Sequence, residues 1–326
     1  MTRGGEAVTF AAMAQRTTTT HPKAEADAPR RYLLAGRELD APTLAAGLHI
    51  VATPIGNLRD ITLRALETLA AADLIACEDT RVTARLLQHY GIRAPLTPYH
   101  DHNAASARPR LLAALARGDA VALVSDAGTP LISDPGFKLA RAAREAGHAV
   151  TTEPGASSVL AALAVAGLPT DRFWFEGFLP AKPGARSNRL QELARLPASL
   201  VIFETGPRIA ASLADMASTL GPREAAVCRE LTKLHEEIRC GDLSTLAAHY
   251  AADAETRGEF VLVIGPPSEQ APEAADIDNL LTQALQRGSV KDAVAEVADA
   301  TGQPRKDIYR RALALALARN GDDAPA

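Results

Sequence analysis

Hydrophobic residues recur along most of the chain in short apolar runs, and each run is followed by a polar or glycine-bearing turn and then by a helical pattern. The clearest run covers residues 120–124 and predicts a strand that is buried on both faces. Similar runs occupy residues 48–52, 74–77 and 149–153. Strands that alternate with helices in this way predict an α/β fold built on a parallel sheet.

The turn after residues 120–124 is the most distinctive in the chain. Ser125-Asp126-Ala127-Gly128 follows the strand, and Ser133-Asp134-Pro135-Gly136 precedes the next helical pattern. Open α/β sheets bind ligands at the carboxyl ends of their parallel strands, so we expect a ligand near Asp126 and Gly128. We also expect Asp134 to be the helix N-cap and Pro135 the first helical residue. An ordinary connecting turn without a ligand is the alternative.

Two other strand ends carry turns of the same kind. Thr53-Pro54-Ile55-Gly56 follows the first strand, and Pro154-Gly155-Ala156-Ser157-Ser158 follows the fourth. Free amides and hydroxyls at a helix start suit a carboxylate or a ribose. The chain lacks the Gly-x-Gly-x-x-Gly pattern at the first turn and lacks Gly-Lys-Ser/Thr, which disfavours a dinucleotide site and a P-loop. The three turns together predict a shared ligand cleft.

Two further polar clusters follow predicted strands. Glu78-Asp79-Thr80-Arg81 comes directly after residues 74–77, and it predicts either a functional site or a helix capped by Thr80. His100 and His102 lie in a polar loop with no cysteine or further histidine nearby. A loop that contacts substrate or solvent is therefore favoured over a metal site, and we expect no metal.

The second half of the chain predicts another α/β unit and a helical tail. Residues 181–186 have the composition of a linker, and residues 265–276 that of a hinge. In the tail, Ser289 and Asp292 resemble a capping box, and a basic helix starts at Arg305 after a short turn, which gives the outline of a helix-turn-helix. A helical cap or a dimer contact is the alternative. The predicted domains are a disordered extension, two α/β domains and the tail, at 1–47, 48–180, 181–266 and 275–320.

Composition narrows the class of protein. The net charge is −4, so contact with a polyanion would depend on local basic patches. Cys77, Cys228 and Cys240 are scattered without a Cys-x-x-Cys pair, which is typical of a protein from a reducing cytoplasm. No apolar run approaches the roughly 20 residues of a membrane span. The first 47 residues show no secretory signal pattern.

Taken together, these motifs resemble the tetrapyrrole-methylase superfamily and, within it, the RsmI family of 16S ribosomal RNA cytidine 2′-O-methyltransferases. The resemblance covers about residues 48–318. It rests on six stretches that follow one another along the chain: Val51–Leu58, Glu78–Arg81, Ser125–Pro130, Pro154–Ser157, Leu168–Phe173 and Arg229–Glu236.

The resemblance implies a two-domain α/β fold of the class III methyltransferases, with S-adenosyl-L-methionine in the cleft between the domains and the helix-turn-helix-like tail beyond them. It also implies a homodimer in the cytoplasm that acts on 16S rRNA in the small ribosomal subunit. The cofactor-binding residues that it implies are Pro54, Gly56, Asp126, Ala127, Gly128, Ile132, Ser133, Gly155, Ser157, Ser158 and Phe203.

Methyl transfer to a ribose hydroxyl needs alignment of the reacting atoms and removal of a proton. Glu78 and Asp79 are the first candidates for the base, followed by His100 and Glu204, and Lys233 is a candidate for stabilising negative charge. The candidate phosphate-binding residues are Arg59, Arg81, Arg85, Arg186, Arg208, Arg305, Lys306 and Arg310. A tetrapyrrole C-methyltransferase and a non-catalytic RNA-binding or ribosome-assembly protein are the alternative functions.

Overall fold

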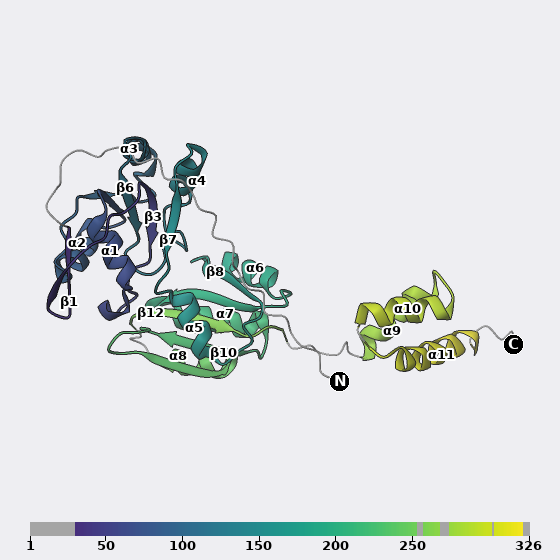
Figure 1. The fold of residues 1–326 in the computed structure, drawn as a ribbon. Helices are drawn as coiled ribbons and strands as arrows, with labels where there is room; N and C mark the ends of the chain where they lie inside the picture. The colour runs from purple at the N-terminus through teal and green to yellow at the C-terminus, as the bar shows by residue number, and fades with distance from the viewer. Residues whose placement is uncertain (1–29, 253–256, 268–273, 302, 322–326) are drawn as a thin grey trace, which may run out of the picture. The chain divides into compact units, whose positions relative to one another are not determined.

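The computed structural model describes residues 30–252, 257–267, 274–301 and 303–321 (Figure 1). They belong to two compact units. Unit 1 comprises the described residues up to Val51 together with 62–126 and 136–153, and unit 2 comprises 52–61, 127–135 and the described residues from Pro154 onward. Each unit contains its own five-stranded sheet.

The sheet of unit 1 is parallel throughout, in the order β5-β4-β6-β3-β7. Its strands are β3 (Gly47–Val51), β4 (Leu74–Cys77), β5 (Leu96–Pro98), β6 (Ala120–Val124) and β7 (Val150–Glu153). Helices alternate with them, namely α1 (Leu63–Ala71), α2 (Thr80–His89), α3 (Ala104–Ala116) and α4 (Phe137–Glu145). All five residues of β6 are buried at the centre of the sheet, which confirms the prediction from its apolar run.

Two helix starts differ from the prediction. Helix α4 begins at Phe137, not at Pro135, and its N-cap is Gly136 at φ +141°. The chain turns again before the helix, and this backbone conformation favours glycine over Asp134 as the cap. Helix α2 is capped by Asp79, not by Thr80, because the Asp79 carboxylate accepts a hydrogen bond from the Arg81 amide at 2.8 Å.

A hairpin occupies part of the segment for which we predicted disorder. Strands β1 (Arg31–Leu34) and β2 (Arg37–Asp40) pair in antiparallel fashion around Ala35 and Gly36, which both have positive φ as a tight hairpin turn requires. Tyr32 is buried, and the Leu33 amide donates to the Tyr90 carbonyl at 2.7 Å. The sequence did not predict this hairpin because each strand has only four residues, and their charged side chains obscure the alternation of apolar and polar positions that marks a strand. Residues 1–29 lie outside the described part of the chain.

The sheet of unit 2 is mostly antiparallel, in the order β11-β10-β12-β9-β8, and only its β8–β9 pair is parallel. Its strands are β8 (Phe173–Phe178), β9 (Ser199–Thr205), β10 (Glu224–Arg229), β11 (Glu237–Asp242) and β12 (Glu259–Ile264). Four helices belong with it, namely α5 (Ser158–Ala166), α6 (Pro183–Leu193), α7 (Gly206–Leu220) and α8 (Leu243–Ala252). Helix α6 begins inside the predicted linker, because Pro183 is suited to the first helical turn.

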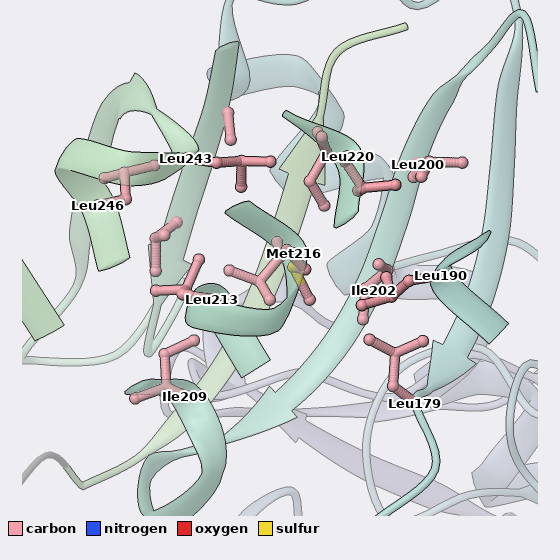
Figure 2. Close-up of a cluster of buried hydrophobic side chains, with 14 of the residues drawn as sticks. Leu179, Leu190, Leu200, Ile202, Ile209, Leu213, Met216, Leu220, Leu243 and Leu246 are labelled. Carbon is pink, nitrogen blue, oxygen red and sulfur yellow. The ribbon is translucent and has the colours of Figure 1, made fainter. Parts of the chain in front are cut away.

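Both faces of this second sheet are covered, and β9 shows why. Leu200 and Ile202 point to one face and pack in a core with residues of α6, α7 and α8, including Leu213 and Met216 (Figure 2). Val201 points to the other face, where residues of α5 cover it. Successive side chains on a strand point to opposite faces, so an apolar strand such as β9 requires helices on both sides.

The tail is a separate three-helix cluster of α9 (Ala274–Leu285), α10 (Val290–Thr301) and α11 (Arg305–Gly321). Half of the predicted capping box is present, because the Asp292 amide donates to Ser289 Oγ at 3.2 Å, whereas the Asp292 carboxylate accepts from the Ser289 hydroxyl at 2.6 Å and not from its amide. Helix α9 starts within the predicted hinge, whose residues 268–273 lie outside the described part. Among the described residues, no helix is long and apolar enough to cross a membrane.

Candidate cofactor and active site

A cavity of about 270 Å³ lies within unit 2, between loops and strand ends that are far apart in the sequence. The loop after β6 and the start of α5 supply its polar backbone. The residues that line it are Ile55, Ala127, Gly128, Thr129, Ile132, Ser133, Asp134, Ser157, Ser158, Val159, Phe178, Phe203, Glu204, Thr205, Cys228, Glu230, Leu231, Lys233, Glu259, Phe260 and Val261.

The loop at residues 127–135 is held in an unusual backbone conformation. Gly128 has φ +79° and exchanges two backbone hydrogen bonds with Thr53, at 2.9 and 3.0 Å. Leu131 and Ser133 also have positive φ, at +75° and +63°. Such conformations are costly for residues other than glycine and are concentrated at ligand sites. The strained backbone of this loop, held by its hydrogen bonds to Thr53, is consistent with a binding role.

The start of α5 forms another polar part of the wall. Ser157 is the N-cap, and its hydroxyl accepts a hydrogen bond from the Leu160 amide at 3.4 Å. The first amides of a helix have no partner within the helix, and the helix dipole favours a negative group there. Ser158 and Val159 line the cavity at this terminus, which suits a carboxylate.

The remaining wall combines apolar surface with carboxylates. Ile55, Phe178 and Phe203 contribute apolar side chains, and the rings of Phe178 and Phe203 lie 5.6 Å apart. The acidic lining residues outnumber the cations, because Lys233 is the only Lys, Arg or His in the lining, against Asp134, Glu204, Glu230 and Glu259. A cavity with this balance favours a ligand that carries positive charge.

S-adenosylmethionine fits this set of groups. Its adenine can lie against the apolar wall, its carboxylate suits the start of α5, and its sulfonium and ammonium charges suit the acidic residues. Of the residues predicted to hold the cofactor, the lining includes Ala127, Gly128, Ile132, Ser133, Ser157, Ser158 and Phe203. Pro54, Gly56, Asp126 and Gly155 are not part of it.

Lys233 and Glu204, both predicted catalytic residues, line the cavity, but the Glu204 carboxylate is occupied inside the protein. The Glu204 side chain is fully buried, and its carboxylate accepts hydrogen bonds from Ser212 Oγ at 2.5 Å and from the Thr205 amide at 2.9 Å. Its Oε1 also lies 3.1 Å from Arg208 Nε. Glu204 therefore stabilises the β9–α7 turn, and this network argues against its use as a base.

Glu78, Asp79 and His100, the other predicted catalytic residues, lie in unit 1. Hydrogen bonds from the Arg81 side chain and amide lower the pKa of Asp79 to about 2. A carboxylate with so low a pKa is a weak base near neutral pH, where the best base has a pKa close to the working pH. Asp79 also caps α2, so its first role is structural. His100 Nδ1 is buried without a hydrogen-bond partner among the described residues.

The predicted RNA-binding residues differ in availability. Arg186 is 4% exposed and its Nε donates to Asp215 at 2.6 Å, which removes it from the candidate phosphate contacts. Arg208 is half-buried at the Glu204 network, and its Nη2 donates to the Leu179 carbonyl. The side chains that are exposed are Arg59, Arg81, Arg85, Arg305, Lys306 and Arg310. Among these, Arg81 pairs with Asp79 and Arg310 pairs with Asp307.

The sequence interpretation missed much of the lining. Half of the missed residues lie on strands of the unit 2 sheet, which give no motif that marks a site. The missed residues are Ile55, Thr129, Asp134, Val159, Phe178, Thr205, Cys228, Glu230, Leu231, Glu259, Phe260 and Val261. Five of them carried a usable signal, because Ile55, Thr129 and Asp134 lie in the strand-end turns, and Glu230 and Leu231 lie in the same polar stretch as Lys233.

Solved structures share the fold of the α/β body. The methyltransferase CobJ matches with a TM-score of 0.51 and 21% identity, over 68% of this chain and 94% of that one. Diphthine synthase matches with a TM-score of 0.51 and 16% identity, over 67% of this chain and 89% of that one. At these identities the likeness concerns the fold alone.

Sequence relatives are far closer. Ribosomal RNA small subunit methyltransferase I of Mesorhizobium japonicum is 53% identical over 279 residues, which span 85% of this chain and 95% of the relative. The protein of the same name from Erythrobacter litoralis is 54% identical over 275 residues, 84% of this chain and 97% of the relative.

Two family profiles match successive parts of the chain. The tetrapyrrole (corrin/porphyrin) methylases match residues 47–247, and the RsmI C-terminal HTH domain matches residues 271–316. The resemblance that the strand-end motifs indicated is thereby confirmed. The chain is a methyltransferase that belongs to the ribosomal RNA small subunit methyltransferase I family, within the tetrapyrrole methylases.

Proposed function

We propose that this chain transfers a methyl group from S-adenosylmethionine to the 2′-hydroxyl of a cytidine ribose in the decoding region of 16S ribosomal RNA. The observation that carries the proposal is the 53% identity to a ribosomal RNA small subunit methyltransferase over 95% of that relative's length. The acidic cavity with a helix start in its wall supports the choice of cofactor. We further propose that the protein works in the cytoplasm as a homodimer.

The residues of the cavity would hold the cofactor by complementary chemistry. When bound, S-adenosylmethionine supplies a methyl group already activated by a positively charged sulfur. The amides at Ser158 and Val159 suit its carboxylate, Phe203 and Ile55 suit its adenine, and Asp134 suits its cationic groups. Because the methyl group is activated, correct orientation of the acceptor oxygen contributes most to the rate.

The acceptor hydroxyl must also lose its proton. Glu78 remains our first candidate for the base, because the pKa of Asp79 is about 2 and the carboxylate of Glu204 is occupied inside the protein. Lys233 would stabilise negative charge on the acceptor oxygen or on a neighbouring phosphate. His100 is the second candidate for the base.

The test is transfer of labelled methyl from S-adenosylmethionine to small ribosomal subunits from cells that lack this methyltransferase. We expect label in 16S RNA, and nuclease mapping should place it on the ribose of one cytidine in the decoding region. Cofactor binding without labelling of RNA would contradict the proposal. An absorbance change on addition of a tetrapyrrole would then favour the C-methyltransferase, and absence of cofactor binding would favour a non-catalytic RNA-binding protein.

Replacing Lys306 with glutamate should weaken RNA binding equally for different sequences. Lys306 is exposed at the start of α11, where a cation can reach a phosphate. Removal of one phosphate contact should reduce the slope of log affinity against log salt by about 1. Fluorescence anisotropy with a labelled decoding-region RNA at several salt concentrations measures this slope.

Lys138→Glu is the matched control, since Lys138 is exposed on α4 and is not among the proposed contacts. An unchanged slope in Lys306→Glu, or an equal change in the control, would exclude Lys306 as a phosphate contact.

A further inference from the structure

The turn that follows β10 has an uncommon backbone. Glu230 and Thr232 have φ values of +49° and +66°, in the left-handed region that residues with a side chain rarely adopt. The turn is closed by hydrogen bonds from the Lys233 amide to the Glu230 carbonyl at 3.0 Å and from the Thr232 amide to Glu236 Oε2 at 2.6 Å. Surrounding contacts must hold such a conformation in place, and conformations of this kind are concentrated at functional sites.

Two carboxylates hold the ammonium group of Lys233. Its Nζ donates to Glu230 Oε1 at 3.0 Å and to Glu259 Oε2 at 2.8 Å. Glu230 is itself fixed, because its Oε1 also accepts from the Glu259 amide and its own amide donates to the Glu259 carbonyl, each at 2.9 Å. The side chain of Lys233 is therefore tied to the backbone of β12 through Glu230.

Two glycines from separate segments make room for this arrangement. A Cβ on Gly56 would overlap Cγ of Lys233, so a larger residue there would displace the lysine. A Cβ on Gly258 would lie 2.9 Å from Cγ of Glu230, and Gly258 has φ +110°. Gly56 was among the predicted cofactor-binding residues, and these contacts give it a different role as the surface on which Lys233 packs.

We infer that Glu230 is the positioning residue for Lys233: it anchors the ammonium group at the cavity wall, with Gly56 and Gly258 as the glycines that the arrangement requires. The role of the anchored lysine in methyl transfer rests on the function proposed above, whereas the anchoring itself does not. Neither Glu230 nor Glu259 was a predicted site residue.

The charge of Lys233 follows from its neighbours. Burial disfavours the ammonium form, but the bonds to Glu259 and Glu230 outweigh it and raise the pKa of Lys233 above its usual value. Other nearby charges have their own partners: Arg229 lies 3.8 Å from Glu237, and Glu236 accepts from the Thr232 amide. Asp134 also lines the cavity and adds negative charge, whereas the Glu204 carboxylate lies 3.1 Å from Arg208 Nε. Lys233 is thus a fixed cation and not a proton acceptor.

The experiment is a pH titration of Lys233 in the full-length protein, followed by NMR of ¹³Cε-labelled lysine. The signal is assigned by its loss in Lys233→Arg. In Glu230→Gln the titration midpoint should move to lower pH, because the amide still accepts hydrogen bonds but no longer carries charge. In Glu259→Gln the midpoint should also move to lower pH, because Glu259 Oε2 accepts from Lys233 Nζ at 2.8 Å.

Glu192→Gln is the matched control, because Glu192 is also an exposed ion-pair carboxylate of unit 2, bonded to Arg189 and outside the cavity lining. We expect no shift of the Lys233 midpoint in this variant. A midpoint unchanged in both Glu230→Gln and Glu259→Gln would overturn the inference, and the second variant decides if the first does not fold. Neither RNA nor cofactor is present, so the result is independent of the proposed function.

A second readout connects the anchor to the reaction. Glu230→Gln should lower the single-turnover rate of methyl transfer about tenfold at saturating S-adenosylmethionine and should weaken cofactor binding by less than this, because one acidic residue is lost from a lining that stays acidic. Equal losses in rate and in cofactor affinity would indicate a collapsed cavity and would contradict a positioning role.

Discussion

Replacing Gly128 with valine is expected to abolish binding of S-adenosylmethionine. Gly128 lines the cavity at φ +79°, and an added Cβ would lie 3.3 Å from Cγ2 of Ile55 and 3.8 Å from the Ala156 carbonyl oxygen. A β-branched side chain is strained at this φ, and it would crowd Ile55 in the cavity wall. We expect at least a 100-fold loss of affinity, equivalent to about 2.8 kcal/mol.

Gly147→Val is the matched control for this variant. Gly147 has φ +81°, almost the same backbone conformation, but a Cβ there has no atom within 4 Å. Both variants should lose stability from backbone strain, by roughly 1–3 kcal/mol each, and only Gly128→Val should lose the cofactor. Calorimetric titration and urea unfolding measure the two effects separately. Retained binding in Gly128→Val, or an equal loss in the control, would show that this loop does not hold the cofactor.

The parts of the site that sequence could predict are those where local chemistry is unusual. Gly128 and Ser157 both follow apolar runs in a parallel-sheet pattern, where strand ends converge by topology. Glu259 had no such signal, because it begins an antiparallel strand and approaches Lys233 only through the pairing of β12 with β10. Contacts made by non-local strand pairing leave no local pattern in a single sequence.

Arg186 shows a different limit. It was predicted to contact RNA as a local cation, yet it is buried together with Leu190 and Leu193 on one face of α6. The spacing i, i+4, i+7 places the three side chains on the same helix face. An arginine on an apolar face can be retained there by an ion pair, here with Asp215. The helical spacing of Arg186 with Leu190 and Leu193 would have predicted its buried position, had it been weighed before its charge.

Charge disfavours Asp79 relative to Glu78 as the proposed base in unit 1. Glu78 and Asp79 are adjacent, but Asp79 is used twice, as the N-cap of α2 and as the partner of Arg81. The hydrogen bonds that give Asp79 its structural role are the same ones that lower its pKa to about 2. The bonds that stabilise the charged form of Asp79 therefore make it a weaker base near neutral pH.

Replacing Lys233 with methionine is expected to lower the single-turnover rate of methyl transfer by about 100-fold or more, the usual cost of removing one group that stabilises developing negative charge. Methionine keeps much of the apolar stem that packs on Gly56. The loss should therefore come from the missing cation, which also leaves Glu230 and Glu259 without their ammonium partner.

The comparison that isolates this effect uses Lys138→Met, which removes the same charge from the exposed face of α4 and should leave the rate unchanged. Affinity for S-adenosylmethionine should fall little in Lys233→Met and can even rise, because loss of the cation makes the cavity more negative and the cofactor is cationic. A rate that survives in Lys233→Met would mean that Lys233 serves only to neutralise Glu230 and Glu259. The rate of methyl transfer would then depend on the orientation of the acceptor oxygen, which can suffice because the sulfonium already activates the methyl group.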